Sequence, residues 1–176
     1  MKKQKSKKKS WFSLIDLIFI VLLAGLVLSV HYFVLVRLRV SNQYMLNLLN
    51  EGDFVFLYRS CYGLYNPLTD EMTDIFWGSP TRGDIILFKS EDGGRKVMRI
   101  LGLPGDKVSY RSGLIFIDSN LIQEPYYRNR SFTVLNPLKL RENIYFVAGD
   151  NSALDEYGGN FEIISRNQIL GKVLKK

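Results

Sequence analysis

An apolar segment near the N-terminus limits what this chain can be. From Leu17 to Val36 the hydrophobic run is interrupted only by Gly25, Ser29 and His31. A helix of this length would extend about 30 Å, the thickness of the hydrocarbon part of a bilayer. A buried core helix is usually shorter, and a cleaved signal peptide has a shorter apolar stretch that ends at a small-x-small site, which is absent here. The segment therefore predicts one uncleaved transmembrane helix that acts as a signal anchor.

Charge predicts the orientation of that anchor. The 176 residues include 24 Lys and Arg against 17 Asp and Glu, a formal net charge of +7, and six of the lysines lie within the first nine positions. Positively charged flanks stay on the cytoplasmic side of a membrane. We expect a single-pass protein of the cell membrane, with a cytoplasmic tail over 1–16, a span over 17–36 and an extracellular domain over 37–176. Outside the tail the chain is close to neutral, which disfavours nucleic acid as a partner.

The scarcity of cysteine and histidine excludes several kinds of site. Cys61 and His31 are each the only residue of their type, and His31 lies within the apolar segment. The body therefore lacks the residues for a disulfide, a Cys-rich metal site, a Ser-His-Asp triad or a Cys-His pair. We expect no metal and no cofactor. Any hydrolysis would have to use carboxylate, lysine or hydroxyl groups.

The body is predicted to be mainly β. Short apolar runs rich in β-branched and aromatic residues are bounded by turn signals, and no long amphipathic helical pattern follows the apolar segment. The stretch of about 110–145 is expected to form a small subdomain. Cys61–Ser79 lacks periodicity and is expected to be an irregular excursion. The predicted strands are Phe54–Tyr58, Ile85–Phe88, Val97–Leu101, Leu114–Ile117 and Ile144–Val147.

The dipeptide Gly-Asp borders a predicted strand four times, at 52–53, 83–84, 105–106 and 149–150. Glycine permits unusual backbone dihedrals, and the aspartate side chain accepts hydrogen bonds from nearby amides, so each pair favours a turn. A pair of catalytic carboxylates, as in an aspartic protease, is the alternative. The shared context at the edge of a strand favours turns.

Four stretches, taken in order, resemble the boxes of type I signal peptidases, especially the small single-span forms of Gram-positive bacteria. The third is the most specific and the first is the most degraded. The resemblance implies a signal peptidase I-like β domain after one membrane helix, and chemistry in which a buried neutral lysine activates a serine. The stretches are Val40–Asp53, similar to V-x-x-x-S-M-x-P-T-L-x-x-G-D; Pro80–Phe88, similar to R-G-D-[IV]-[IV]-x-F; Met98–Asp106, similar to K-R-[VI]-[IV]-G-L-P-G-D; and Phe146–Asn151, similar to the start of G-D-N-R…S-x-D-S-R.

The resemblance also implies that the catalytic dyad is missing. Counting from the glycines of the boxes places Tyr44 at the nucleophile, Met98 at the general base and Ala153 at the orienting hydroxyl. A phenol with no base beside it is a poor nucleophile, and a thioether is of no use as a proton acceptor. Ser41 and Lys96 are offset from these positions and would both have to move to rebuild a dyad.

We therefore expect a non-catalytic homologue, a pseudoenzyme that binds exported polypeptide outside the membrane. An extended peptide would dock by strand addition. Similar proteins of Gram-positive pilus loci suggest pilin subunits, beside a sortase, as partners in pilus assembly. The alternative is an active serine endopeptidase that removes signal peptides; a sortase is excluded because its chemistry needs an extracellular histidine. The predicted groove residues are Asn42, Tyr44, Met45, Met98, Arg99, Asp150, Asn151 and Asp155.

Overall fold

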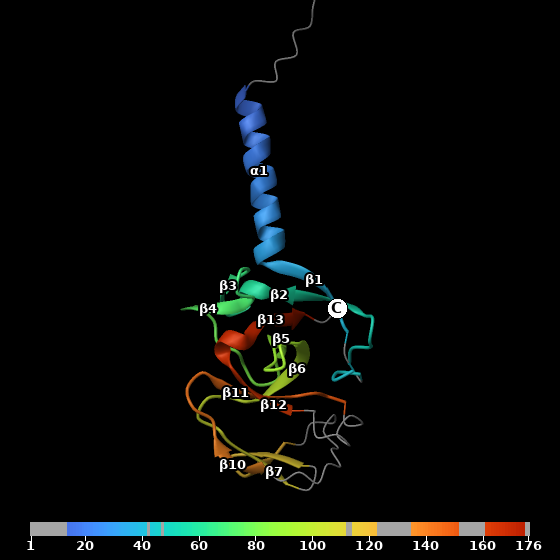
Figure 1. Cartoon of the computed structure of the whole chain (residues 1–176), viewed down its shortest axis with the longest axis vertical. Coiled ribbons are helices and arrows are strands. Elements are labelled where there is room, and N and C mark those ends of the chain that lie inside the picture. The colour runs from blue at the N-terminus through green and yellow to red at the C-terminus, as the bar shows by residue number, and fades with distance from the viewer. Residues whose placement is uncertain are drawn as a thin grey trace, which may run out of the picture.

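We analysed a computed structural model of the chain, which describes residues 14–41, 43–46, 48–111, 114–122, 135–151 and 161–174. Helix α1 (Leu14–Phe33) projects from one end of a β-rich body (Figure 1). Contrary to the transmembrane helix predicted over 17–36, no helix among the described residues is both long and apolar enough to cross a bilayer.

The helix also ends earlier than predicted, at Phe33 and not at Val36. Strand β1 (Leu35–Arg39) begins two residues before the expected boundary, so Leu35 and Val36 are strand. Their backbone pairs antiparallel with β2 (Phe54–Tyr58), where Leu35 lies opposite Tyr58 and Val36 opposite Leu57. The sequence of these residues is as apolar as the helix before them, and the pairing with β2 decides their conformation.

A seven-stranded antiparallel sheet forms most of the body, in the order β1-β2-β13-β5-β6-β11-β12. The strands predicted around Phe54, Ile85, Val97 and Ile144 are all confirmed and lie in this sheet. A 3-10 turn, Arg166–Gln168, leads from β12 into β13. The bounds of the other strands are β13 Ile169–Leu174, β5 Ile85–Lys89, β6 Arg95–Gly102, β11 Ile144–Ala148 and β12 Phe161–Ser165.

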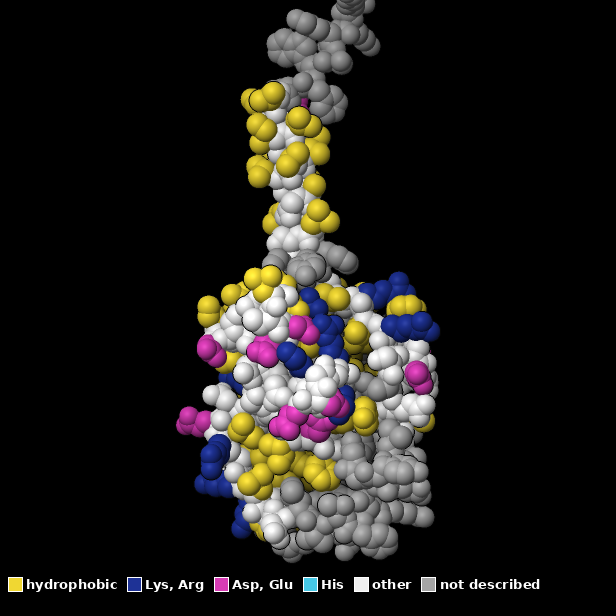
Figure 2. Space-filling model, in the orientation of Figure 1, with side chains coloured by type: hydrophobic (Ala, Val, Ile, Leu, Met, Phe, Trp, Pro, Cys, Tyr) yellow, Lys and Arg dark blue, Asp and Glu magenta, His cyan; other side chains and the backbone are white. Residues whose placement is uncertain are grey.

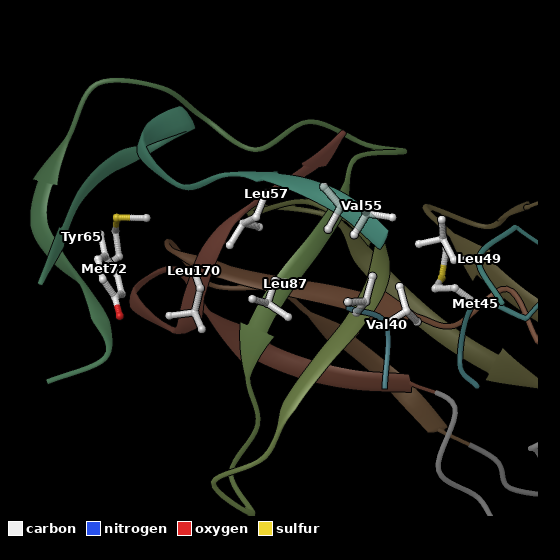
Figure 3. Packing of buried hydrophobic residues seen from close by; sticks show 11 residues of the cluster. Val40, Met45, Leu49, Val55, Leu57, Tyr65, Met72, Leu87 and Leu170 are labelled. Atoms are coloured by element: carbon white, nitrogen blue, oxygen red, sulfur yellow. The ribbon is translucent and has the colours of Figure 1, made fainter. Parts of the chain in front are cut away.

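Both faces of this sheet are buried, as alternate residues of β5 show. Leu87 packs into one cluster, whereas Ile86 and Phe88 pack into another on the opposite face. Figure 3 shows the first cluster, in which Leu57, Leu87 and Leu170 lie between two ends. One end holds Val40, Met45, Leu49 and Val55, and the other holds Tyr65 and Met72. Met45 is fully buried, so the loop after β1 is anchored in this core.

A second, four-stranded sheet in the order β10-β7-β8-β9 lies at the end of the body away from α1 (Figure 1). It overlaps the stretch expected to form a subdomain and includes the predicted strand Leu114–Ile117. A third apolar cluster joins the two sheets through residues such as Val108, Leu140 and Phe146. The bounds are β7 Lys107–Arg111, β8 Leu114–Ile117, β9 Asn120–Leu121 and β10 Leu135–Lys139.

The irregular excursion predicted over Cys61–Ser79 is wrong, because a short 3-10 turn, Arg59–Cys61, is followed here by a hairpin of β3 (Gly63–Asn66) and β4 (Glu71–Phe76). Tyr65 and Met72 lie opposite each other and are both buried. The register shifts between Gly63 and Tyr65, which disguises the alternation in the sequence.

Three of the four Gly-Asp pairs form the same turn. Each glycine has a positive φ, between 91° and 96°, which suits a residue without a side chain. Each aspartate side chain accepts a hydrogen bond from the backbone N–H three residues earlier. These bonds are Asn50 to Asp53 at 2.9 Å, Thr81 to Asp84 at 2.9 Å and Leu103 to Asp106 at 2.6 Å.

Candidate functional site

The candidate site lies where the loop after β1 meets strand β6 and the end of β11. The backbone N–H of Asn151 donates to the Tyr44 carbonyl at 2.8 Å, and the Asn151 side-chain amide donates to the Gln43 carbonyl at 2.8 Å. These two bonds bring together the first and the last of the family-like stretches, which are separated by about one hundred residues in the sequence. Asn42, Ala153 and Asp155, which the sequence also assigned to the site, lie outside the described residues.

Met98 occupies an apolar environment at the position where the resemblance implies a general base. Its side chain is fully buried in a cluster that includes Ile86, Phe88 and Ile100. Tyr44 is half-buried and packs against the same cluster, so the structure brings Tyr44 and Met98 to one core. A thioether offers no proton acceptor of useful strength, and this pair has no means of activating a nucleophile.

A lysine is nevertheless close by, two residues earlier on the same face of β6. Lys96 Nζ lies 5.8 Å from the centre of the Tyr44 ring. It contacts Glu162 Oε1 at 2.6 Å, Asp92 Oδ2 at 3.0 Å and Ser90 Oγ at 3.1 Å. The Ser90 hydroxyl in turn donates to Glu162 Oε2 at 2.7 Å.

The charge state of Lys96 follows from these contacts. Partial burial alone would lower the pKa of Lys96, but the hydrogen bonds and negative charges of Glu162 and Asp92 outweigh it and raise this pKa above its ordinary value. A protonated ammonium cannot accept the proton of a serine. Ser90 and Lys96 therefore lie within hydrogen-bonding distance without the neutral amine that a Ser-Lys mechanism needs.

Sequence reasoning missed this cluster. The alternation of β6 placed Lys96 on the Met98 side, but Ser90 and Glu162 were not predicted to join it. Glu162 lies in β12, 66 positions after Lys96, and local patterns do not indicate a contact across that separation. Ser41, the serine weighed with Lys96, is exposed and lines a surface pocket with Arg39, Val40, Glu51 and Gly52.

Two further predicted groove residues form a buried ion pair. Arg99 Nε lies 3.0 Å from Asp150 Oδ1, and Arg99 Nη2 lies 2.6 Å from Asp150 Oδ2. Arg99 also donates to the Gly83 carbonyl at 3.0 Å, and the Asp150 side chain is fully buried. The fourth Gly-Asp pair thus supplies a carboxylate to Arg99. This paired geometry fixes the backbone of β6 beside the site and leaves both side chains engaged.

Among the described residues, no group of three histidine, cysteine or carboxylate side chains could hold a metal ion.

A family model described as "Signal peptidase, peptidase S26" matches residues 11–175 of the sequence. This chain belongs to the signal peptidase family.

Individual signal peptidases are similar to it at moderate identity. Signal peptidase I of Bacillus caldolyticus is 26% identical over 161 residues, which cover 84% of this chain and 81% of that protein. Signal peptidase I of Buchnera aphidicola is 32% identical over 110 residues, which cover 60% of this chain and only 35% of that protein. A crystal structure of a signal peptidase I from Enterococcus faecalis is 28% identical, with a TM-score of 0.44 over 55% of this chain and 97% of that one. The predicted family is confirmed.

Proposed function

We propose that this signal peptidase homologue is non-catalytic and binds exported polypeptide in an extended conformation. The observation that carries the proposal is the full burial of Met98 among apolar side chains, at the position aligned with the family's general base. A base there would have to be a lysine kept neutral by the same surroundings.

The nearest lysine supports the same proposal. Lys96 is held by Glu162 and Asp92, which favour its charged form. To act as a base it would have to lose its proton against two carboxylates, and this is the opposite of the environment that activates a catalytic lysine.

A strand edge beside Tyr44 suits peptide binding, because no described strand pairs with it. Strand β11 pairs with β6 only through Arg99, Ile100 and Gly102. On that side of β6, no strand within the described ranges pairs with Arg95–Met98. An extended peptide could add to this edge through backbone hydrogen bonds, with Tyr44 and the Lys96 cluster beside it.

The proposed partner is an exported polypeptide on the outer side of the cell membrane. Pilin subunits assembled beside a sortase are the case that the family resemblance implies. The N-terminal apolar segment would hold the chain at the membrane, since helix α1 exposes apolar side chains from Leu14 to Leu28 (Figure 2).

A cleavage assay tests the absence of catalysis. The full chain, in detergent micelles, is incubated with a precursor that carries a signal peptide, and the products are resolved by mass spectrometry. We expect no specific cleavage. Cleavage that disappears in Lys96→Met, and persists in the matched surface variant Lys107→Met, would overturn the proposal.

A binding assay tests whether the chain binds an extended polypeptide. An extended peptide from a candidate pilin, labelled with a fluorophore, is titrated with the full chain, and its anisotropy is followed. Tyr44→Ala should weaken binding, because Tyr44 lies near Lys96, in the part of β6 that no described strand pairs on that side. Tyr58→Ala makes the same change on the outer side of β2 and should leave the affinity for the peptide unchanged. Equal affinities of the two variants would exclude a groove at Tyr44.

An active signal peptidase is the second candidate function. The observation that favours it is that the similar proteins from Bacillus caldolyticus and Buchnera aphidicola are both named signal peptidase I. Specific cleavage of the precursor in the cleavage assay would show that the chain is an active signal peptidase.

A further inference from the structure

An open cavity of about 600 Å³ lies between the turn after β6 and the segment that joins β10 to β11. We call it the turn cavity. It is at the end of the body away from α1, where Figure 1 shows β10, and neither Tyr44 nor Lys96 lines it. A cavity of this size can hold a short peptide segment or a small molecule. Its lining is mostly apolar and consists of Pro104, Gly105, Lys139, Leu140, Arg141 and Glu142.

Two backbone hydrogen bonds hold the walls of the turn cavity together. The Gly105 N–H donates to the Leu140 carbonyl at 2.9 Å, and the Leu140 N–H donates to the Asp106 carbonyl at 2.8 Å. Leu140 is buried in the apolar cluster that joins the two sheets. The space above Gly105 is open, since a Cβ there would meet no heavy atom within 4 Å beyond its chain neighbours. The cavity is therefore already formed in the free chain, which lowers the cost of ordering it around a ligand.

Cations gather at this cavity without carboxylate partners. Lys139 and Arg141 line it, and Lys139 lies directly opposite Lys107 of the neighbouring β7. All three side chains are exposed, and within the described parts of the chain no carboxylate lies within ion-pairing distance of any of them. Like charges at directly opposite positions of an antiparallel pair destabilise a sheet. An anion bound beside them would relieve this repulsion.

The neighbouring carboxylates do not supply that anion. Asp106 Oδ2 accepts a hydrogen bond from Arg82 Nη2 at 2.8 Å, and Asp118 Oδ1 accepts one from the Lys107 backbone N–H at 2.9 Å. Glu142, the one carboxylate of the described lining, is exposed and lies next to Arg141 in the sequence without forming an ion pair with it. Positive charge therefore exceeds negative charge at the cavity, which favours a negatively charged occupant.

We propose that the turn cavity binds a peptide segment of a partner protein in which an acidic side chain lies next to a large apolar one. The carboxylate would contact Lys139 and Arg141, and the apolar side chain would pack over Pro104 and Leu140. A mostly apolar lining with a few charged groups suits such a pair of side chains. The inference is independent of the edge of β6 and of the absence of catalysis, because the cavity shares no residue with either.

Three short peptides test the chemistry of the occupant. The amidated peptide Gly-Ser-Glu-Phe-Ser-Gly, labelled with fluorescein at its N-terminus, is titrated with the full chain in uncharged detergent micelles, and its anisotropy is followed. Two matched peptides carry glutamine in place of glutamate or alanine in place of phenylalanine. We expect the first peptide to bind more tightly than both, and its affinity to fall as salt is raised. If the alanine peptide binds equally well, the cavity takes any anion, and if the glutamine peptide does, the cations play no part; either result would overturn the proposal.

Variants of the chain test whether the peptide binds at the turn cavity. The double variant Lys139→Gln, Arg141→Gln should weaken binding by about fivefold or more, because two ion pairs are lost. The matched double variant Lys89→Gln, Arg95→Gln removes the same net charge from β5 and β6 and should leave the affinity unchanged. Glu142→Gln should strengthen binding, since it removes a carboxylate that repels the ligand. Equal affinities of the two double variants, or no gain in Glu142→Gln, would overturn the proposed site.

Discussion

Two neighbouring positions on one face of β6 have opposite surroundings. Met98 is fully buried among apolar side chains, whereas Lys96, two residues earlier, contacts two carboxylates and a hydroxyl. An amine at position 98 would be neutral and isolated, and the amine at position 96 is charged and paired. The difference shows that the presence of a lysine near the site says little about catalysis until its partners are known.

The largest expected effect comes from placing a lysine at the buried position. Met98→Lys should destabilise the fold by about 4 kcal/mol or more at pH 7, because burial lowers the pKa of such an amine by about 3–5 units. The folded-state pKa would lie below the unfolded value, so the penalty is greatest at low pH and shrinks as pH rises between the two. Chemical denaturation at pH 6 and pH 9 measures this. Met98→Leu, the matched control, should cost less than about 1.5 kcal/mol. A stability loss that does not change with pH would contradict a buried amine.

A second prediction contrasts the carboxylates that pair with Arg99 and Lys96, two of the three cations of β6. Asp150→Ala should cost about 3–5 kcal/mol, because it removes the carboxylate that balances the charge of the largely buried Arg99 guanidinium. Asp92→Ala removes an exposed partner of Lys96 and should cost far less. Denaturant midpoints of the two variants measure the difference. Similar midpoints would show that the two ion pairs contribute alike.

Glu162 provides a more modest test of the Lys96 environment. Glu162→Gln should lower the pKa of Lys96 and cost about 1–2 kcal/mol at pH 7. Since the folded pKa of Lys96 is raised, this contribution is complete below the unfolded value of about 10.4 and is lost as pH rises through the folded value. Carbon-13 titration of the lysine side chains measures the pKa, with Glu71→Gln as a control at Lys89. An unchanged pKa at Lys96 would show that Glu162 does not set its charge.

The smallest effect is expected at the loop that carries Tyr44. Asn151→Ala removes the side-chain hydrogen bond to Gln43 but keeps the backbone bond to Tyr44, so it should cost about 1 kcal/mol. Hydrogen exchange of the loop amides should quicken, while those of β5 remain protected. Unchanged exchange in residues 43–46 would mean that the backbone bond to Tyr44 and the burial of Met45 hold the loop without the Asn151 side chain.

Much of the fold follows from local sequence patterns. The confirmed strands are short apolar runs between turn residues, and three Gly-Asp pairs form the expected turns because each bond spans only three residues. The β3–β4 hairpin was missed because a register shift at Gly63 breaks the period-two pattern. The end of the apolar segment was misplaced because Leu35 and Val36 suit a helix and a strand equally.

The candidate site was predictable only in part. The spacing of the family-like boxes placed Tyr44 and Met98 in one site, and the structure packs both into one cluster. The partners of Lys96 come from distant strands, and the ion pair of Arg99 with Asp150 spans 51 positions. Such contacts depend on the order of strands in the sheet, which local patterns do not contain.

The position of β13 in that order has a consequence for how the protein is made. This strand, the last along the described chain, lies between β2 and β5 and is the third of the seven strands of the main sheet. Until β13 has been synthesised, β2 and β5 each have one unpaired edge. The strand pair β1-β2 and the strand group β5-β6-β11-β12 then have no strand between them. The main sheet is therefore completed inside and not at its outer edge. Until β13 pairs, the nascent chain exposes two strand edges with free backbone N–H and C=O groups, to which a chaperone could bind.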